Sequence, residues 1–560
     1  MPKRPAPPTP APPQEIEAKF SVSDAQLLDS LRQAPEPIPG AVLGPGQTVT
    51  ATDTYYDTPD FAFLRAGYAL RLRTLAERAD EPAIVTIKGL GSLPRAVSAG
   101  AVHARFEVEG PVTPGEPAAQ MAAWPSAVRK KAKAITGARP ALHPILILTQ
   151  VRTKRSVRMV GHDAEEGALA ELSVDGVEVF DPKGLGAPKV GDFSEIELEL
   201  QQSGEDALAQ FHAVAETLAA QSGLTPVGQS KSAQGLLLIS THPAGSGEPA
   251  LGMRPAQSMA EAGRVVWRHE LMKMLLAEAG VRQGEEMEYV HDMRVATRRA
   301  RAALAMFGPY YQAKTLDDYA KRLRKTARLL GDVRDLDVAL AGLDRAMRGK
   351  SEKQIAGSQA LRARWVKERD TAQADLLRWF DSQKYQRFIA DFAAFCTHAQ
   401  VGAFNFTQQP GMPPVPHQVR HVLPGALWDR FEQVRAYEIL FTEDEDTEIP
   451  DDTLHKLRID GKALRYNLDF AQHLLGAEGQ ILLKQLKQMQ NHLGDLNDAV
   501  GKAASLEVMR QAGADSPFLA HYIDVQTATA DRLRRTFPAL WERFNKSETR
   551  SRLARALARI

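Results

Sequence analysis

Two carboxylates and an ammonium group alternate near the start of the chain, in the segment Glu15-Ile16-Glu17-Ala18-Lys19. Successive side chains on a β-strand point to opposite faces, so Glu15, Glu17 and Lys19 share one face. Carboxylate oxygens are the ligands that Mg²⁺ and other hard cations prefer. Ammonium and guanidinium groups bind phosphate oxygens. A strand of this kind is suited to binding a phosphate ligand together with a metal ion.

Three later segments also place every charged residue on one parity, namely 69–73 (ALRLR), 105–109 (RFEVE) and 195–200 (EIELEL). An antiparallel sheet with one solvated face alternates polar and apolar residues too, but that face usually mixes Thr, Ser and Gln with the charges. Here it is almost purely Glu, Arg and Lys, and rows of Glu repel one another unless they share cations. The pattern predicts a sheet whose charged face holds cations and an anion.

These segments resemble the CYTH domain family in order and spacing over about residues 14–240. The resemblance rests on Glu15–Lys19, Tyr55–Thr58, Leu70–Arg73, Thr86–Gly89, Arg105–Glu109, Asp175–Gly176, Glu195–Glu199 and Ser230–Ser232. It implies a triphosphate tunnel metalloenzyme, in which an eight-stranded antiparallel β tunnel carries carboxylates for Mg²⁺ or Mn²⁺ and basic side chains for a triphosphate.

The resemblance also implies which residues line the tunnel. The metal-binding set is Glu15, Glu17, Glu107, Glu109, Asp175, Glu195, Glu197 and Glu199. The triphosphate-binding set is Lys19, Arg71, Arg73, Lys88, Arg105, Arg152, Arg155 and Lys231. Within these sets, the candidates for catalysis are Glu15, Glu17, Lys19, Lys88 and Arg105. Arg152 and Arg155 are an odd number of positions apart, so a regular strand directs them to opposite faces; either a bulge intervenes or Lys154 shares the face of Arg152.

Composition limits the class of protein. A chain of 560 residues exceeds what one hydrophobic core usually serves, so at least two domains are expected. The 70 Lys and Arg against 69 Asp and Glu give a net charge of +1, which argues against indiscriminate binding to nucleic acid. The single cysteine, Cys396, excludes an internal disulfide and fits a reducing compartment. Without a secretory signal or a span of about 18 apolar residues, we expect a soluble cytoplasmic protein with no membrane partner.

A Pro- and Gly-rich segment divides the chain into two parts. The predicted fold class is multidomain α+β, with the β tunnel followed by an all-α domain. The predicted boundaries are a disordered Pro-rich tail at 1–13, the tunnel domain at 14–240, a linker at 241–254, a helical domain at 255–545 and a helical tail at 546–560.

Two stretches of the helical part match each other. Residues 291–301 align with 455–465, and residues 330–335 align with 493–498, at offsets of 164 and 163. The match indicates a tandem duplication, with repeats at about 255–395 and 425–545. Helical spacing places the basic residues of each repeat along two stripes, one on each of two helices. The basic residues are His291, Arg294, Arg298, Arg301, Lys321, Arg324 and Arg328 in the first repeat, and His455, Arg458, Lys462, Arg465, Lys484 and Lys487 in the second.

A basic run is ordinarily a solvated helix face, but such a face usually places Glu four residues from Lys, and these stripes contain no acid. The repeated residues resemble the CHAD domain family. That resemblance implies a bundle of helices in two pseudo-symmetric halves, with a basic cavity that binds inorganic polyphosphate. Four nearby aspartates are expected either to orient the arginines or to cap helices, namely Asp332, Asp335, Asp495 and Asp498.

Together these features predict a metal-dependent inorganic triphosphatase that cleaves tripolyphosphate to pyrophosphate and phosphate, with a helical domain that binds polyphosphate. Two other activities stay open: a CYTH adenylate cyclase, and hydrolysis of nucleoside or thiamine triphosphates. A third alternative is a non-catalytic protein that attaches to polyphosphate granules through both domains. The tunnel carboxylates argue against it, because a pure anion binder gains nothing from Glu. The preferred metal, the oligomeric state and any coupling of the domains are not determined by these patterns.

Overall fold

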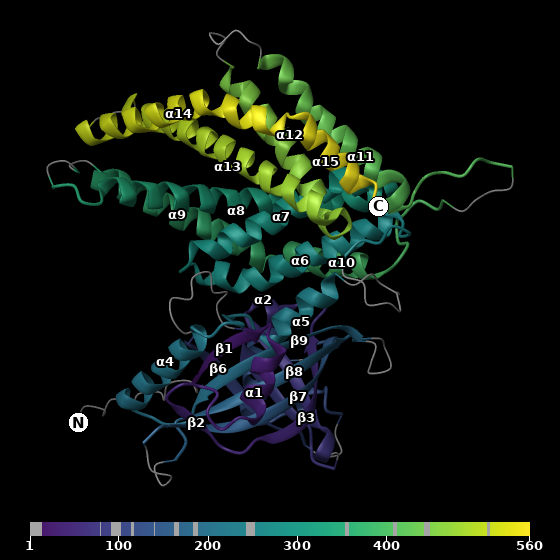
Figure 1. Ribbon diagram of the computed structural model, residues 1–560, viewed down its shortest axis with the longest axis vertical. Coiled ribbons are helices and arrows are strands. Elements are labelled where there is room, and N and C mark those ends of the chain that lie inside the picture. The colour runs from purple at the N-terminus through teal and green to yellow at the C-terminus, as the bar shows by residue number, and fades with distance from the viewer. Residues whose placement is uncertain are drawn as a thin grey trace. The chain divides into compact units, whose positions relative to one another are not determined.

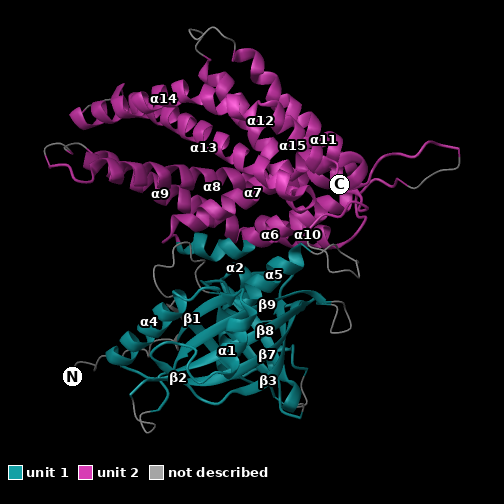
Figure 2. Ribbon diagram, viewed as in Figure 1, with its two compact units in different colours: residues 1–242, 246–249, 275–283 teal, residues 243–245, 250–274, 284–560 magenta. Residues whose placement is uncertain are grey.

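The chain divides into two compact units, which are coloured separately in Figure 2. The first comprises residues 1–242, 246–249 and 275–283, and the second comprises residues 243–245, 250–274 and 284–560. The predicted tail at 1–13 and residues 242–251 of the predicted linker lie outside the described residues. The computed structural model describes residues 14–78, 80–90, 102–113, 117–138, 140–161, 167–182, 189–241, 252–352, 355, 358–406, 411–441, 449–511 and 516–560.

The first unit is built on an antiparallel sheet that closes on itself (Figure 1). Its strands are β1 (Gln14–Val22), β2 (Ala41–Leu43), β3 (Gln47–Asp57), β4 (Tyr68–Leu75), β5 (Ile84–Gly89), β6 (Val102–Pro111), β7 (His143–Met159), β8 (Ala170–Phe180), β9 (Lys189–Leu200) and β10 (Leu224–Pro226). Because β1 pairs with both β6 and β9, the path β1-β6-β5-β4-β3-β7-β8-β9 returns to β1.

Eight strands were predicted, whereas the sheet has ten strands among the described residues. Two of the ten, β2 and β10, are three residues long and pair with β7 and β1. A segment of three residues is too short to show the alternation of polar and apolar residues from which strands are recognised in a sequence.

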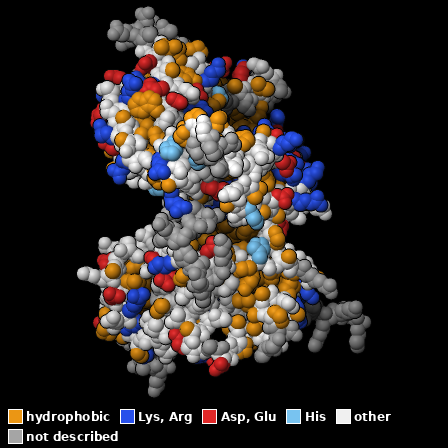
Figure 3. Space-filling model, turned by 90° about the vertical axis from the view of Figure 1, so that its right-hand side faces the viewer, with side chains coloured by type: hydrophobic (Ala, Val, Ile, Leu, Met, Phe, Trp, Pro, Cys, Tyr) orange, Lys and Arg blue, Asp and Glu red, His pale blue; other side chains and the backbone are white. Residues whose placement is uncertain are grey.

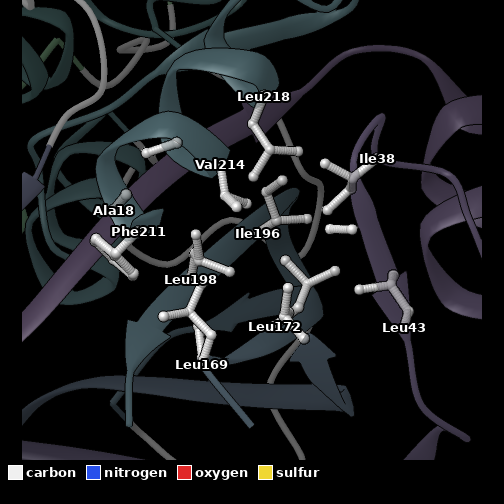
Figure 4. Packing of buried hydrophobic residues seen from close by; sticks show 14 of the residues in the cluster. Ala18, Ile38, Leu43, Leu169, Leu172, Ile196, Leu198, Phe211, Val214 and Leu218 are labelled. Atoms are coloured by element: carbon white, nitrogen blue, oxygen red, sulfur yellow. The ribbon is translucent and has the colours of Figure 1, made fainter. Parts of the chain in front are cut away.

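The closed sheet is polar inside and apolar outside. On β1, Glu17 and Lys19 face the enclosed side, while Ala18 and Phe20 face outward and are fully buried. The outward residues are buried because helices cover that face of the sheet. Figure 4 shows part of one cluster, in which labelled side chains of the sheet meet those of a helix at 205–219: Ala18, Leu172, Ile196, Leu198, Phe211, Val214 and Leu218.

The helices of the first unit are α1 (Ala25–Gln33), α2 (Ala62–Arg65), α3 (Ser126–Thr136), α4 (Glu205–Ala219) and α5 (Lys231–Ser240), with 3-10 turns at 76–78 and 121–123. Helix α5 packs tightly on β7, where a Cβ at Gly235 would lie 2.9 Å from a methyl carbon of Leu146 and 3.0 Å from one of Leu148. Glycine therefore permits this close approach. The approach places Lys231, at the start of α5, beside carboxylates of the sheet.

The second unit is helical among its described residues. Its helices are α6 (Met259–Gln283, of which 275–283 group with the first unit), α7 (Met287–Phe307), α8 (Ala313–Met347), α9 (Ser358–Asp381), α10 (Gln383–Thr397), α11 (Val419–Arg435), α12 (Asp451–Phe470), α13 (Gln472–Gln511), α14 (Pro517–Phe544) and α15 (Ser547–Leu557), with 3-10 turns at 308–310 and 436–440. Helices α7 and α12 carry the matched basic stripes, and they pack against each other. The other matched segments lie on α8, which packs on α7, and on α13, which packs on α12.

Two surface properties accompany this fold. On the face shown in Figure 3, basic and acidic side chains are interspersed, in keeping with the net charge of +1. Among the described residues, no helix is both long enough and apolar enough to cross a bilayer.

Candidate functional site

Charged side chains on the inner face of the closed sheet surround a cavity of about 320 Å³ in the first unit. Its lining contains seven cationic side chains and four glutamates, so positive charge is in excess at the surface of the cavity. The described lining residues are Lys19, Tyr55, Ala69, Arg71, Arg73, Lys88, Gly89, Leu90, Arg105, Glu107, Glu109, Arg152, Glu197, Glu199, Ser230, Lys231 and Ser232.

Glu197 on β9 is shared by cations from three other elements. Its carboxylate accepts a hydrogen bond from Lys19 of β1, and it lies 2.5 Å from Arg152 Nη2 of β7 and 2.7 Å from Lys231 Nζ of α5. Burial alone would raise the pKa of Glu197, but Lys19, Lys231 and Arg152 together hold it well below its usual value. Glu197 is therefore ionised at neutral pH.

Glu17 on β1 is the second shared carboxylate, and its side chain is almost fully buried. Arg105 Nη1 lies 3.0 Å from Glu17 Oε1, Lys19 Nζ lies 3.6 Å from the same atom, and Lys88 Nζ lies 3.8 Å from Oε2. Lys88 also binds Glu107 at 2.9 Å. The interior charges thus form one connected network, in which Glu17 and Glu197 each have three cationic partners.

Three carboxylates come close enough together to bind one metal ion. The oxygens offered by Asp175, Glu195 and Glu197 lie within 4.8 Å of one another. Lys231 Nζ contacts all three, at 2.9 Å from Asp175, 2.6 Å from Glu195 and 2.7 Å from Glu197. A cluster that consists only of carboxylate oxygens fits a hard divalent cation, and the identity of that cation stays a prediction.

The structure brings most of the predicted tunnel residues together. Seven of the eight predicted basic residues line the cavity, as do Glu107, Glu109, Glu197 and Glu199. Glu17, Asp175 and Glu195 contact these cations from positions that are almost fully buried. Glu15 lies on β1, but its side chain is outside the described residues.

The eighth basic residue, Arg155, was placed in the tunnel wrongly. The pairing of β7 with β8 runs through Arg155 without a register shift, so no bulge changes its direction, and it faces away from Arg152. Its guanidinium donates hydrogen bonds to four backbone carbonyls, those of Leu31, Ala34, Leu43 and Gly44. Lys154 has the parity of Arg152, but it pairs with Glu171 and is 41% exposed.

Asp53 on β3 was missed in the sequence. It is fully buried, and both of its oxygens accept hydrogen bonds from Arg73, at 2.7 and 2.8 Å. Gln150 Nε2 donates to it at 3.1 Å. A signal was present, because Asp53 has the same parity as the inward-facing Tyr55. It was overlooked because a single acidic residue in a strand does not reproduce the repeated charge pattern.

A second group of cations lies in the helical unit, where α7 meets α12. The guanidinium of Arg298 on α7 lies 5.6 Å from the ring centre of Tyr466 on α12, and the guanidinium of Arg465 lies 4.8 Å from the same ring. The basic stripes of the two matched segments therefore converge on one place.

Lys462 on α12 lies within this group. Burial lowers its pKa, and repulsion from Arg458, Arg298 and Arg294 lowers it further, to about 7, while Asp498 of α13 acts in the opposite direction. Lys462 has no ion pair among the described residues. This group of cations has an excess of positive charge that a bound anion would compensate.

The other predicted basic residues of this unit are less buried. His455 contacts Asn497 Oδ1 at 2.6 Å through Nδ1, and Arg294 lies 3.9 Å from Asp335, which agrees with the expectation that this aspartate orients an arginine. Arg328 lies 4.0 Å from Asp332. His291 is half-buried on α7. The exposed members of the set are Arg301, Lys321, Arg324, Arg328, His455, Lys484 and Lys487.

Comparison with protein families assigns both units. The sequence matches the CYTH domain over residues 13–231 and the CHAD domain over residues 266–507. The protein therefore contains a CYTH domain followed by a CHAD domain, as the sequence motifs predicted. A comparison with curated proteins finds no significant match.

Several solved structures are similar to one part of the chain. The CHAD domain from the plant Ricinus communis is 22% identical, covering 55% of this chain and 95% of its own, with a TM-score of 0.37. PptA from Streptomyces chartreusis is 18% identical, covering 51% and 100%, with a TM-score of 0.38. HpAC1 from Hippeastrum, named as an adenylyl cyclase with a dominant triphosphatase activity, is 20% identical, covering 40% and 94%, with a TM-score of 0.29.

The environment of Lys462 predicts that anion binding by the CHAD domain depends on pH. Below about pH 7 Lys462 is already charged, whereas above it each bound polyanion must first draw a proton onto the amine. If a polyanion such as inorganic polyphosphate binds at this group of cations, its affinity is therefore expected to fall as the pH rises from 6 to 9, by up to about tenfold for each unit above 7, since one proton is linked to binding. Titration calorimetry at several pH values measures this dependence.

Lys462→Arg is the matched control, because arginine keeps its charge across this range. It should bind polyphosphate with a flatter pH profile, and proton uptake on binding at pH 8 should fall toward zero. Identical profiles for the wild-type protein and this variant would contradict the assignment.

Proposed function

We propose that this protein is a metal-dependent inorganic triphosphatase. Its CYTH domain cleaves tripolyphosphate to pyrophosphate and phosphate, and its CHAD domain binds inorganic polyphosphate. The observation that carries the proposal is the cavity inside the closed sheet, where seven cationic side chains face the space and their carboxylate partners lie among and behind them. A purely anion-binding cavity would need no such carboxylates.

The chemistry of phosphoryl transfer supports this function. The reaction needs in-line positioning of the phosphate groups and stabilisation of charge on their oxygens, with little covalent chemistry from the protein. Lys19, Arg152 and Lys231 are pre-positioned around one space by their shared partner Glu197. When a triphosphate enters, its oxygens replace the carboxylate as partners of these cations, so the binding groups need little reorganisation.

The carboxylates give the domain its proposed metal dependence. A bound Mg²⁺ or Mn²⁺ ion supplies charge neutralisation at phosphate oxygens and acidifies a coordinated water. The residues proposed to hold it are Glu17, Glu107, Glu109, Asp175, Glu195, Glu197 and Glu199, with Glu15 from the sequence motif. A carboxylate that held such an ion would leave its cationic partner free to bind the triphosphate.

The size and lining of the cavity favour an inorganic substrate over a nucleotide. Its 320 Å³ lies at the small end of the range for ligand pockets. Among the described lining residues the only aromatic is Tyr55, which is buried next to Asp53 and has a pKa raised to about 12 by burial and by that carboxylate. A nucleobase would have no other described ring on which to stack.

The proposal for the CHAD domain rests on the convergence of cations between α7 and α12, the elements that carry the two matched stripes. We propose that these elements belong to two repeats, which contribute Arg294 and Arg298 from one and Arg458 and Lys462 from the other to a single polyphosphate site. Binding of long chains at this site would associate the protein with polyphosphate granules.

Phosphate release tests the enzymatic function. Wild-type protein is expected to release phosphate from tripolyphosphate with Mg²⁺ or Mn²⁺, faster than from ATP or thiamine triphosphate, and to release none in EDTA. Glu17→Gln and Glu197→Gln should each lower kcat by about 100-fold or more, the scale reported for removing one preorganised group. A malachite-green assay across the three substrates measures this.

Glu178→Gln is the matched control, since Glu178 is a half-exposed glutamate on β8 in a surface pair with Lys189. It should keep wild-type turnover. Absence of phosphate release from all three substrates with either metal would favour the non-catalytic alternative, release of pyrophosphate from ATP would favour a cyclase, and normal turnover of Glu197→Gln would contradict the tunnel assignment.

A four-site variant tests the polyphosphate site. Replacing Arg294, Arg298, Arg458 and Lys462 with alanine should weaken binding of long-chain polyphosphate by about 100-fold or more and flatten its dependence on salt, because released counterions scale with the number of phosphate contacts. Tripolyphosphate hydrolysis by the same protein should be unchanged. Affinity is measured by calorimetry at several salt concentrations.

The control for this variant replaces four basic residues that form local ion pairs on the surface of the helical unit, namely Arg362, Arg364, Arg378 and Arg510. It removes the same net charge and should bind polyphosphate within a few-fold of wild type. Equal losses in the two variants would show that overall charge, and not this site, determines affinity.

A further inference from the structure

Asp53 lies beside the cavity, and the proposed function gives this residue no role. It lies on β3 opposite Arg73 of β4, and it is fully buried. Arg73 donates to it from Nε at 2.7 Å and from Nη2 at 2.8 Å, in a bidentate pair. Arg71 Nη1 lies 3.6 Å from Oδ2 of the same carboxylate. One buried charge thus contacts two of the cations that line the cavity.

The geometry of the pair determines what Arg73 offers to a ligand. Because Nε–H and one N–H of Nη2 bind Asp53, this pair leaves both N–H groups of Nη1 and the second N–H of Nη2 for a ligand. A bidentate pair also fixes the plane of the guanidinium, which a single contact would not do. Burial alone would raise the pKa of Asp53, but Arg71 and Arg73 lower it below its usual value, so the carboxylate keeps its charge.

Arg71 is fixed from a second side. Its Nη2 donates to Thr86 Oγ1 at 3.2 Å, and Thr86, which is fully buried on β5, donates to Glu109 at 3.1 Å. Gln150 on β7 holds Asp53 itself through a hydrogen bond of 3.1 Å. The two arginines of β4 are therefore held directly by Asp53 of β3 and Thr86 of β5, which are in turn bonded to Gln150 of β7 and Glu109 of β6.

Asp175 forms the same kind of pair elsewhere in the tunnel. It is fully buried and accepts hydrogen bonds of 2.8 Å from both Nε and Nη2 of Arg152. Asp175 also contacts Lys231 and belongs to the carboxylate cluster suited to a metal ion. Asp53 differs because it lies outside that cluster, and among the described residues its side chain contacts two arginines and an amide. A role in metal binding therefore does not explain it.

We propose that Asp53 is a positioning residue, which orients Arg73 and Arg71 so that their free N–H groups bind the phosphate groups of the substrate. This inference rests on the proposed function of the tunnel in binding a triphosphate. It assigns Asp53 no contact with the substrate. Its contribution passes through the two arginines, chiefly through the bidentate pair with Arg73, so most of it should disappear when Arg73 can no longer form that pair.

A double-mutant cycle tests the proposal. Asp53→Asn should weaken tripolyphosphate binding about tenfold and raise KM by a similar factor, with a smaller change in kcat. Arg73→Gln should have an effect at least as large. Adding Asp53→Asn to Arg73→Gln should change the affinity by less than about twofold. Calorimetry in EDTA measures binding without turnover, and Asp192→Asn, at an exposed position on β9, is the control that should match wild type.

A purely structural role predicts different results. Asp53→Asn would then lower the amount of active protein and its thermal stability, and leave KM unchanged. In the double variant, the fold-loss of activity caused by Asp53→Asn would multiply the fold-loss caused by Arg73→Gln. Either an unchanged affinity or multiplicative effects would overturn the proposal.

Arg73→Lys keeps the inference testable if Asp53→Asn does not fold. Lysine retains the charge but cannot form the bidentate pair, so this variant should lose affinity as Arg73→Gln does. Wild-type affinity in Arg73→Lys would overturn the positioning role. If the wild-type protein binds tripolyphosphate in EDTA but never hydrolyses it, the enzymatic function fails while the cycle still decides the role of Asp53. If it binds tripolyphosphate neither in EDTA nor with Mg²⁺ or Mn²⁺, both are overturned.

Discussion

The protein's first unit depends on mutual neutralisation of charges that face an enclosed space. A closed sheet buries its inner face, and removing one partner of a buried ion pair typically costs about 3–5 kcal/mol. Glu17, Glu197 and Asp175 are tolerated there because each is shared among several cations. Under the proposed function the same arrangement would serve binding, because phosphate oxygens could replace the carboxylates as partners of the cations, and a metal ion could replace the cations as partner of the carboxylates.

In the helical unit, by contrast, one group of basic side chains has an excess of positive charge. Where α7 meets α12, cations outnumber the acids near them, and the result is a lysine whose pKa falls to about 7. The tunnel stabilises its charges internally, whereas this group of cations depends on an external anion for full compensation. The two domains would thus recognise related ligands by different means: a preorganised network of opposite charges in the CYTH domain, and uncompensated positive charge in the CHAD domain.

Whether the position of a residue could be predicted from the sequence depends on how far along the chain its interaction partners lie. Parity within a strand is local, so Glu17, Lys19, Arg71, Arg73 and Glu197 were assigned to the inner face correctly. The error at Arg155 came from giving family resemblance more weight than that parity. Asp53 and Gln150 were missed because their importance arises only from pairing between β3, β4 and β7, and that register is not encoded in any one of the segments.

The sequence by itself determined the two domains, the alternation that makes one sheet charged inside and apolar outside, and the basic stripes on matched helices, since these are patterns of near neighbours along the chain. Only the tertiary structure decided which charges meet. Closure of β1 onto both β6 and β9 brings Lys19 to Glu197, the close packing at Gly235 brings Lys231 to the carboxylates, and the packing of α7 on α12 lowers the pKa of Lys462. Electrostatic energy depends on distance in space, and residues far apart in the sequence acquire that distance only when the chain folds.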